Sequence, residues 1–148
     1  ELKKPQLIVI LGLGYSKRNE IKKMSNEMNQ IGFNVKIIEK SDNLSEYFKQ
    51  CDFAITSNGR TVFEIAAMKI PMIAIAVNNR ERLHSFVRYS KCGFHIDMHS
   101  KQDYSIVMKK ISHMMNYEYR EKFVKNLHEI ELLNGIDRVK KLIYKKLS

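Results

Sequence analysis

The residues best suited to chemistry form one short polar stretch, Ser57-Asn58-Gly59-Arg60-Thr61, with Glu64 three residues further on. The stretch separates an apolar segment, residues 53–56, from residues 62–68, whose apolar side chains have helical spacing. Such a junction lies at the carboxyl end of a strand and the amino end of a helix. Open α/β sheets bind their ligands at that edge. We therefore predict a ligand site at this junction.

Glu64 has two interpretations that the sequence leaves open. Thr61 and Glu64 have the spacing of a capping box, in which each side chain binds the other residue's backbone N–H. That structural role alone accounts for both residues. In the functional interpretation, the Glu64 carboxylate accepts two hydrogen bonds from a ribose diol, since each carboxylate oxygen can take one hydroxyl proton.

Cations stand at the start of three of the predicted helices, each of which follows a predicted strand. A helix dipole disfavours a cation at its amino end by roughly 0.3–1 kcal/mol, so this repetition indicates that an anion binds there, and a phosphate fits. The alternative is that a chain with a net charge of +10 carries arginines everywhere. The residues concerned are Lys17, Arg18, Arg60, Arg80 and Arg82.

The loop Gly12-Leu13-Gly14 begins like a dinucleotide-binding fingerprint but lacks its third glycine, because Lys17 stands at that position. There is no Walker sequence either. We therefore expect neither a dinucleotide nor any other cofactor. Gly12 and Gly14 either allow a tight turn or expose N–H groups to a phosphate at the start of the next helix.

A third polar group, Asn78 to His84, follows the second apolar strand. Asn78 or Asn79 suits an N-cap, while Glu81 and His84 would lie within reach of the same cleft. His84 is a possible general acid or base, but nothing near it in sequence pairs with it, so no catalytic residue is assigned.

The remaining histidines and the cysteines show no metal-ligand spacing, and no metal is expected. We predict that the histidines lie at the surface and that the cysteines are structural, since no base adjoins either. These residues are His95, His99, His113, His128, Cys51 and Cys92.

Strands and helices alternate along the chain, which predicts an α/β fold with a doubly wound, Rossmann-like parallel sheet of about five to six strands and flanking helices. The expected strands are residues 6–11, 33–38, 53–56, 72–77 and 94–98. The expected helices are residues 17–30, 44–50, 62–68, 80–91, 103–115, 119–132 and 137–147.

Composition bounds the function. A chain of 148 residues with 44% hydrophobic residues is long enough for one globular domain, expected over residues 1–148. No apolar run approaches the roughly 20 residues of a membrane span, and two cysteines without metal-ligand spacing favour a reduced protein of the cytoplasm. Nucleic acid is disfavoured as a partner, because many lysines have the spacing of solvated helix faces and no groove-reading motif is present.

The stretch from Asp52 to Met98 resembles the C-terminal domain of GT-B-fold nucleotide-sugar enzymes. It is similar to the N-acetylglucosaminyltransferase that completes the lipid-linked peptidoglycan precursor, and closer to the UDP-sugar hydrolase of pseudaminic acid biosynthesis and its spore-coat polysaccharide relatives. The residues that carry the resemblance are Cys51-Asp52, Ser57 to Thr61, Glu64, Ala66 to Pro71, Asn79-x-Glu81, Gly93 and the tail Asn134-Gly135-Ile136-Asp137-Arg138-Val139.

The resemblance implies a role for each matching residue. Ser57 to Thr61 would hold a diphosphate, Glu64 would bind the ribose, and Asn79 and Glu81 would contact sugar or ribose. Gly12 and Gly14 would match the family's glycine-rich loop. Leu13 and Arg60 depart from the small residues common in the family, and Arg60 would either fork onto a phosphate or fill the nucleotide's space.

The resemblance also implies a missing partner domain, because the family's cleft lies between two domains and its catalytic histidine belongs to the N-terminal half. We expect this piece to bind a nucleotide sugar (UDP- or CMP-linked) weakly and to be inactive alone. One hypothesis is half of a glycosyltransferase or hydrolase in surface polysaccharide or sialic-type acid synthesis. The alternative is a non-catalytic accessory domain, fused to a sugar cytidylyltransferase.

Overall fold

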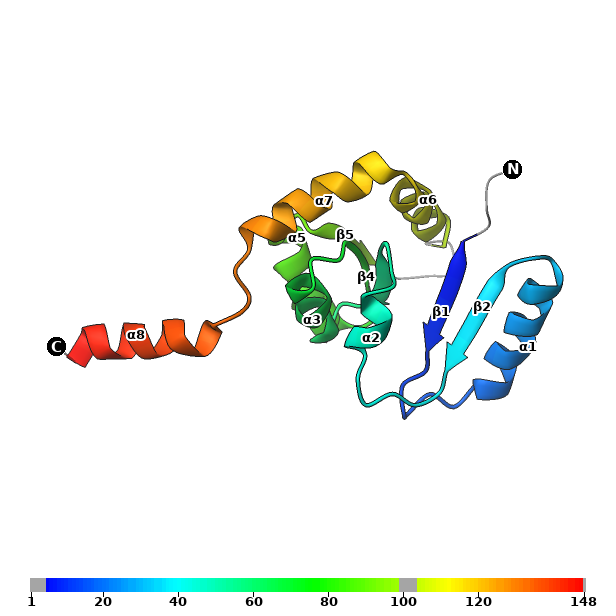
Figure 1. The fold of residues 1–148 in the computed structure, drawn as a ribbon, viewed down its shortest axis with the longest axis horizontal. Coiled ribbons are helices and arrows are strands. Elements are labelled where there is room, and N and C mark those ends of the chain that lie inside the picture. The colour runs from blue at the N-terminus through cyan, green and yellow to red at the C-terminus, as the bar shows by residue number, and fades with distance from the viewer. Residues whose placement is uncertain (1–4, 99–103, 148) are drawn as a thin grey trace. The chain divides into compact units, whose positions relative to one another are not determined.

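The computed structural model describes residues 5–98 and 104–147, which divide into a compact unit that ends at Tyr47 and a second that begins at Phe48 (Figure 1). The α/β class with parallel strands and flanking helices is confirmed. Five strands are present among the described residues. That the whole chain is one nucleotide-sugar-binding domain stays a prediction.

The first unit is a βαβ arrangement. Strands β1 (Gln6–Ile10) and β2 (Asn34–Ile38) are parallel neighbours, joined by helix α1 (Arg18–Gln30). Gly32, at φ 87°, takes the left-handed backbone that lets the chain turn back after α1. Helix α2 (Ser45–Phe48) lies at the boundary between the units.

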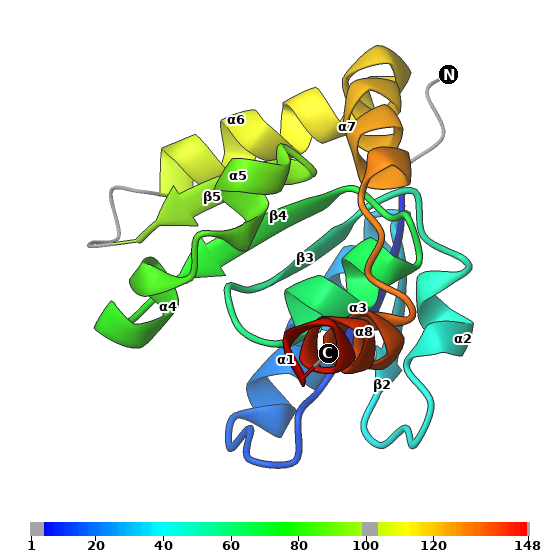
Figure 2. The ribbon, with the colours of Figure 1, turned by 90° about the vertical axis from the view of Figure 1, so that its left-hand side faces the viewer.

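The second unit is built on a three-stranded parallel sheet in the order β3-β4-β5 (Figure 2). Its strands are β3 (Ala54–Ser57), β4 (Met72–Ala76) and β5 (Gly93–Asp97). Its helices are α3 (Thr61–Ala67), α4 (Asn79–Leu83), α5 (Phe86–Ser90), α6 (Tyr104–Met115), α7 (Tyr117–Glu129) and α8 (Gly135–Leu147).

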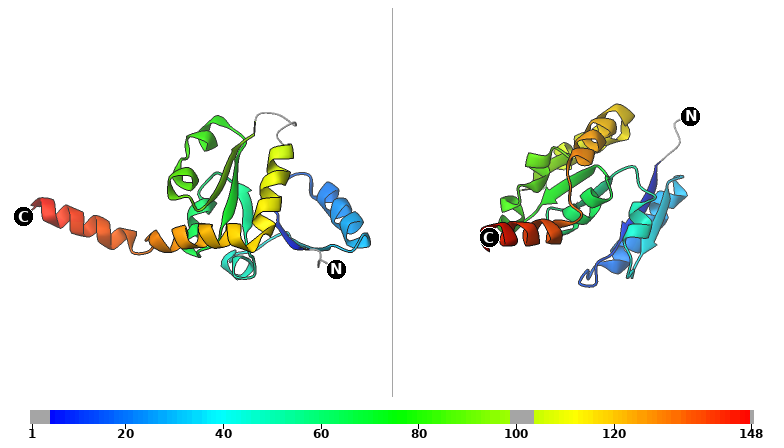
Figure 3. Two further views of the ribbon diagram at one scale, coloured as in Figure 1. Left: turned by 90° about the horizontal axis from the view of Figure 1, so that it is seen from above. Right: turned by 60° about the vertical axis from the view of Figure 1, so that its left-hand side comes forward.

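The central strand β4 is apolar on both faces, as a parallel strand between two helical layers requires. Ile73 packs in a cluster with Ile96 of β5 and Met114 of α6. Because side chains alternate along a strand, Met72 and Ala74 point to the opposite face. Figure 3 shows α6 on one side of the strands and the segment with α4 and α5 on the other.

Residues 80–91 were predicted as one helix, but the structure has two, α4 and α5. The chain leaves the helix at His84, whose ψ of 112° is extended. The side chain of Asn58 binds the carbonyl oxygens of Glu81 and His84 at this point. The carbonyl oxygens of Glu81 and His84 thus accept hydrogen bonds from Asn58, a residue outside the helix, at the point where α4 ends.

Helix α8 extends from the second unit without packing on it (Figures 1 and 3). Its apolar side chains are exposed: Ile136 by 74%, Leu142 by 66% and Leu147 by 80%. No helix in the described residues has the length and apolar character needed to cross a membrane.

Candidate functional site

The loop after β3 is fixed by a buried asparagine. Asn58 is fully buried, and its backbone N–H extends the sheet by donating to the Ile75 oxygen. Its Nδ2 donates to the carbonyl oxygens of Glu81, at 2.7 Å, and His84, at 2.8 Å. The loops that follow β3 and β4 are therefore held together at the carboxyl edge of the sheet by one amide.

His84 forms a further hydrogen bond between the same two loops, this time from its own side chain to the backbone of Asn58. Its Nδ1 lies 2.7 Å from the Asn58 carbonyl oxygen. A carbonyl oxygen only accepts, so Nδ1 carries the proton and, in the neutral ring, Nε2 is left as an acceptor. No residue near His84 in the sequence was expected to pair with it. The structure supplies a partner from 26 residues away.

The segment after β4 is capped locally. Asn78 is the N-cap of α4, as expected, and its Oδ1 accepts from the Glu81 N–H at 2.9 Å. One oxygen of the Glu81 carboxylate accepts from the Val77 N–H at 3.0 Å. Asn79 accepts a bond from Arg82. Glu81 therefore has a structural task, and its predicted contact with a ligand stays a prediction.

The predicted capping box of Thr61 and Glu64 is wrong. Helix α3 begins at Thr61, its N-cap is Arg60, and no side chain bonds to the helix start. Arg60 already has helical backbone angles (φ −67°, ψ −29°), so Thr61 lies inside the helix and not at the cap position. Glu64 is exposed, and its carboxylate has no hydrogen-bond or ion-pair partner in the described part of the chain.

The cations at the helix starts fall into two groups. Arg60 and Arg80 are exposed and bind no carboxylate within residues 5–98 and 104–147. Arg18 instead donates to the carbonyl oxygens of Gly12 and Leu13, and Lys17 forms an ion pair with Glu20. The cations of α1 therefore have protein partners, whereas Arg60 and Arg80 remain available to an anion.

Gly12 and Gly14 lie exposed in the first unit. A Cβ at either position would meet no atom within 4 Å, and neither has a positive φ. Neither backbone conformation nor close packing requires glycine here. Their role at a phosphate stays a prediction.

The surface position predicted for the other histidines is partly wrong. The His95 side chain is 5% exposed, and the His113 ring stacks on Tyr119 with centroids 4.8 Å apart. His128 is exposed, as predicted, and His99 lies outside the described residues. The burial of His95 could not be read from the sequence. Successive side chains of β5 point to opposite faces of the sheet, but the sequence does not show which face a helix covers.

Burial raises the pKa of the thiols of Cys51 and Cys92, which agrees with structural cysteines and not with activated nucleophiles. Among the described residues, no three His, Cys, Asp or Glu side chains are grouped to hold a metal ion.

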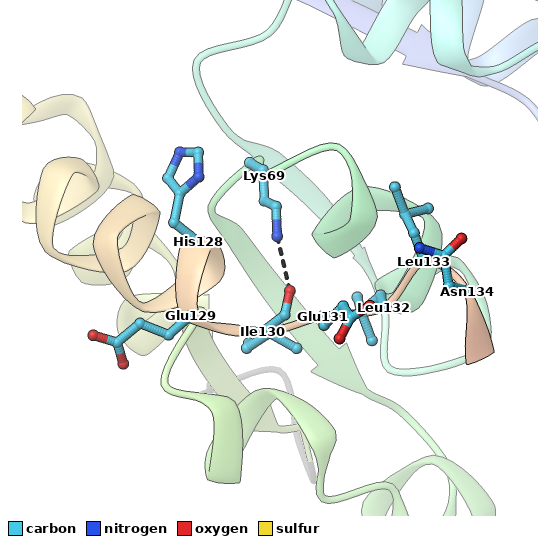
Figure 4. Close-up of a pocket in the computed structure, with 8 residues that line it drawn as sticks. All are labelled: Lys69, His128, Glu129, Ile130, Glu131, Leu132, Leu133 and Asn134. Atoms are coloured by element: carbon cyan, nitrogen blue, oxygen red, sulfur yellow. Dashed lines mark hydrogen bonds between the residues drawn. The ribbon is translucent and has the colours of Figure 1, made fainter. Parts of the chain in front are cut away.

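A cavity of about 270 Å³ lies between the turn after α3 and the segment that joins α7 to α8 (Figure 4). At its wall Lys69 Nζ donates to the carbonyl oxygens of Leu127 and Ile130, at 2.7 and 2.8 Å. Lys69 thus closes the end of α7 and is not free to bind a ligand.

No family model matches this chain. No curated protein matches it either. Among solved structures, the chain is similar to the spinosyn forosaminyltransferase SpnP, with 15% sequence identity and a TM-score of 0.48. The match covers 95% of this chain and 44% of the SpnP chain, so this chain spans less than half of that protein's length.

Proposed function

We propose that this chain is the nucleotide-sugar-binding part of a glycosyltransferase or a nucleotide-sugar hydrolase. The nucleotide is UDP or CMP, and the pathway is that of a surface polysaccharide or a sialic-type acid. The observation that carries the proposal is the exposed carboxylate of Glu64, for which the described part of the chain supplies no partner. With the capping box absent, Glu64 is a first-turn carboxylate of α3, which the helix dipole favours, and its two oxygens can each accept a hydroxyl proton of a ribose diol.

The surroundings of Glu64 support the proposal. Arg60 stands four residues before it, at the N-cap of α3, and its guanidinium, which binds no carboxylate among the described residues, can bind a phosphate with two parallel hydrogen bonds. Ser57 and Gly59 flank the buried Asn58, whose side chain fixes the loop before any ligand arrives. A loop held in place loses little conformational freedom on binding, which favours affinity.

In this proposal, different residues bind different parts of the nucleotide sugar. Glu64 takes the ribose hydroxyls, and the Ser57–Thr61 loop with Arg60 takes the phosphates. Asn79 and Glu81, which follow β4 at the same edge of the sheet, contact the sugar or the ribose. The Nε2 of His84 lies on the ring whose Nδ1 binds the Asn58 oxygen, and we assign it no catalytic step. Gly12 and Gly14 remain candidate phosphate contacts of the first unit.

The first test is a calorimetric titration of this chain with UDP, and with CMP for comparison. We expect saturable binding that weakens about 10- to 100-fold in Glu64→Gln, because a hydrogen bond to a charged group contributes about 1.5–3 kcal/mol. The matched control is Glu118→Gln, an exposed glutamate in the first turn of α7, which should bind like the wild type. Equal affinities in the wild type and Glu64→Gln would contradict the assignment.

A second function, a non-catalytic accessory domain fused to a sugar cytidylyltransferase, is favoured by a different observation. Helix α8 exposes Ile136, Leu142 and Leu147, and an exposed apolar face suits a protein partner. This alternative expects no heat with either nucleotide at millimolar concentration, in the wild type as in Glu64→Gln.

A further inference from the structure

Strand β5 carries a histidine–carboxylate pair that the proposed function has not used. His95 Nε2 lies 2.8 Å from Asp97 Oδ1. The two residues are two positions apart on a strand and therefore share a face. The His95 side chain is 5% exposed, whereas that of Asp97 is 37% exposed. A buried ring thus holds a carboxylate that solvent can reach.

The ring is neutral in this arrangement. Burial, followed by the charge of Arg88, lowers the pKa of His95, and the opposing effect of Asp97 is smaller. A neutral ring that donates Nε2–H to the carboxylate has an unprotonated Nδ1. That Nδ1 is buried and has no hydrogen-bond partner in the described part of the chain. The hydrogen bond to Asp97 is therefore the one polar contact found for this ring within residues 5–98 and 104–147.

Asp97 lies at the carboxyl edge of the sheet, next to the proposed site. It is opposite Ala76, the last residue of β4, and the Met98 N–H donates to the Ala76 oxygen. Neighbouring strands lie about 4.8 Å apart, so Asp97 flanks the point where the chain leaves β4 toward Asn79 and Glu81. The ends of β3, β4 and β5 form one continuous edge.

For the second oxygen of the Asp97 carboxylate, the described residues supply no hydrogen bond or ion pair. In a chain with 26 Lys and Arg residues, Asp97 has no Lys or Arg ion-pair partner within the described ranges. An ionised carboxylate only accepts hydrogen bonds, so the oxygen not bound to His95 suits a hydroxyl group.

We propose that Asp97, positioned by His95, binds a hydroxyl of the sugar in a nucleotide sugar. The inference builds on the proposed function and adds the part of the ligand that reaches β5. Two strand spacings, about 10 Å, separate the β3 loop from β5. A ligand whose phosphates bind at the Ser57–Thr61 loop reaches Asp97 with the group beyond its diphosphate, which is the sugar.

The test compares ligands with and without the sugar. UDP, UDP-glucose and UDP-N-acetylglucosamine are titrated calorimetrically into the wild type, Asp97→Asn and the control Asp137→Asn, an exposed aspartate in the first turn of α8. We expect Asp97→Asn to weaken at least one nucleotide sugar about tenfold and to leave the UDP affinity unchanged. Asp137→Asn should match the wild type with all three ligands.

His95 is tested as a positioning residue by two variants. Gln retains an N–H donor and Leu does not. His95→Leu should therefore lose the same part of the nucleotide-sugar affinity as Asp97→Asn, and His95→Gln should retain most of that affinity. If Asp97 served only as a hydrogen-bond partner for the buried His95 ring, these variants would change the stability of the fold. They would not change the difference in affinity between UDP and the nucleotide sugars.

The outcomes separate the two proposals. A wild type that binds neither these ligands nor CMP overturns the proposed function. Binding of UDP and of the nucleotide sugars that Glu64→Gln weakens and Asp97→Asn leaves unchanged overturns the role of Asp97 alone. Loss of UDP binding in Asp97→Asn also overturns it, because the effect is then not confined to the sugar.

Discussion

At the scale of single residues, Gly93 shows how closely β4 and β5 approach. A Cβ added at Gly93 would lie 1.9 Å from the carbonyl oxygen of Met72 on the neighbouring strand. The obstructing atom belongs to the backbone of the central strand and cannot turn aside as a side chain does. Glycine is therefore required here by space and not by backbone angle, since its φ is not positive.

We predict that Gly93→Ala lowers the free energy of unfolding by about 3 kcal/mol or more, because the strands must move apart. Urea unfolding followed by circular dichroism measures the change. Gly135→Ala is the control: its added Cβ would meet no atom closer than 3.7 Å, and its effect should stay within about 0.5 kcal/mol. Equal effects of the two substitutions would contradict this account.

The sequence identified the polar residues of the site but not what each one does. Asn58 was predicted as part of a ligand-binding loop, and the structure shows it buried, with partners 23 and 26 residues away. Glu64 matched a local capping pattern, yet α3 begins one residue too early for that pattern. Local spacing cannot reveal bonds between distant loops, nor where a helix takes its first turn.

At the scale of elements, Lys69 joins two helices. It follows α3 with a left-handed backbone (φ 61°), and its ammonium group binds two carbonyl oxygens at the end of α7. Carbonyls at a helix end lack partners within the helix and carry the negative end of its dipole. One side chain thus closes α7 against the turn between α3 and β4 (Figure 4).

We predict that Lys69→Met lowers the free energy of unfolding by about 1–3 kcal/mol, because two carbonyl groups lose a charged donor. Thermal and urea unfolding provide the measurement. Lys125→Met, which removes only an exposed ion pair with Glu121 on α7, should cost less than about 0.5 kcal/mol. The proposed role of Lys69 is wrong if both substitutions cost the same.

The regular elements followed from the sequence because their cause is local. The apolar run of β4 and the helical spacing of α1 and α7 predicted each element within a few residues. The break between α4 and α5 did not follow, because it coincides with hydrogen bonds from Asn58, which lies on another loop.

At the scale of the whole molecule, the chain forms two compact units, and the residues of the proposed site on β3, β4 and β5 all belong to the second. The order of the strands was not readable from the sequence, because alternation gives the class of sheet but not which strands are neighbours. The exposure of α8 was equally hidden, since its apolar spacing predicts a helix that is covered on one side.

The isolation of α8 has a consequence for its dynamics. A helix of 13 residues without a packed face is only marginally stable in water, so its backbone hydrogen bonds should open locally while the sheet stays folded. In hydrogen–deuterium exchange followed by mass spectrometry, we expect the α8 amides to exchange at least about a hundredfold faster than those of β4, since their opening does not require global unfolding. Protection of α8 equal to that of β4 would mean that another surface covers this helix in solution.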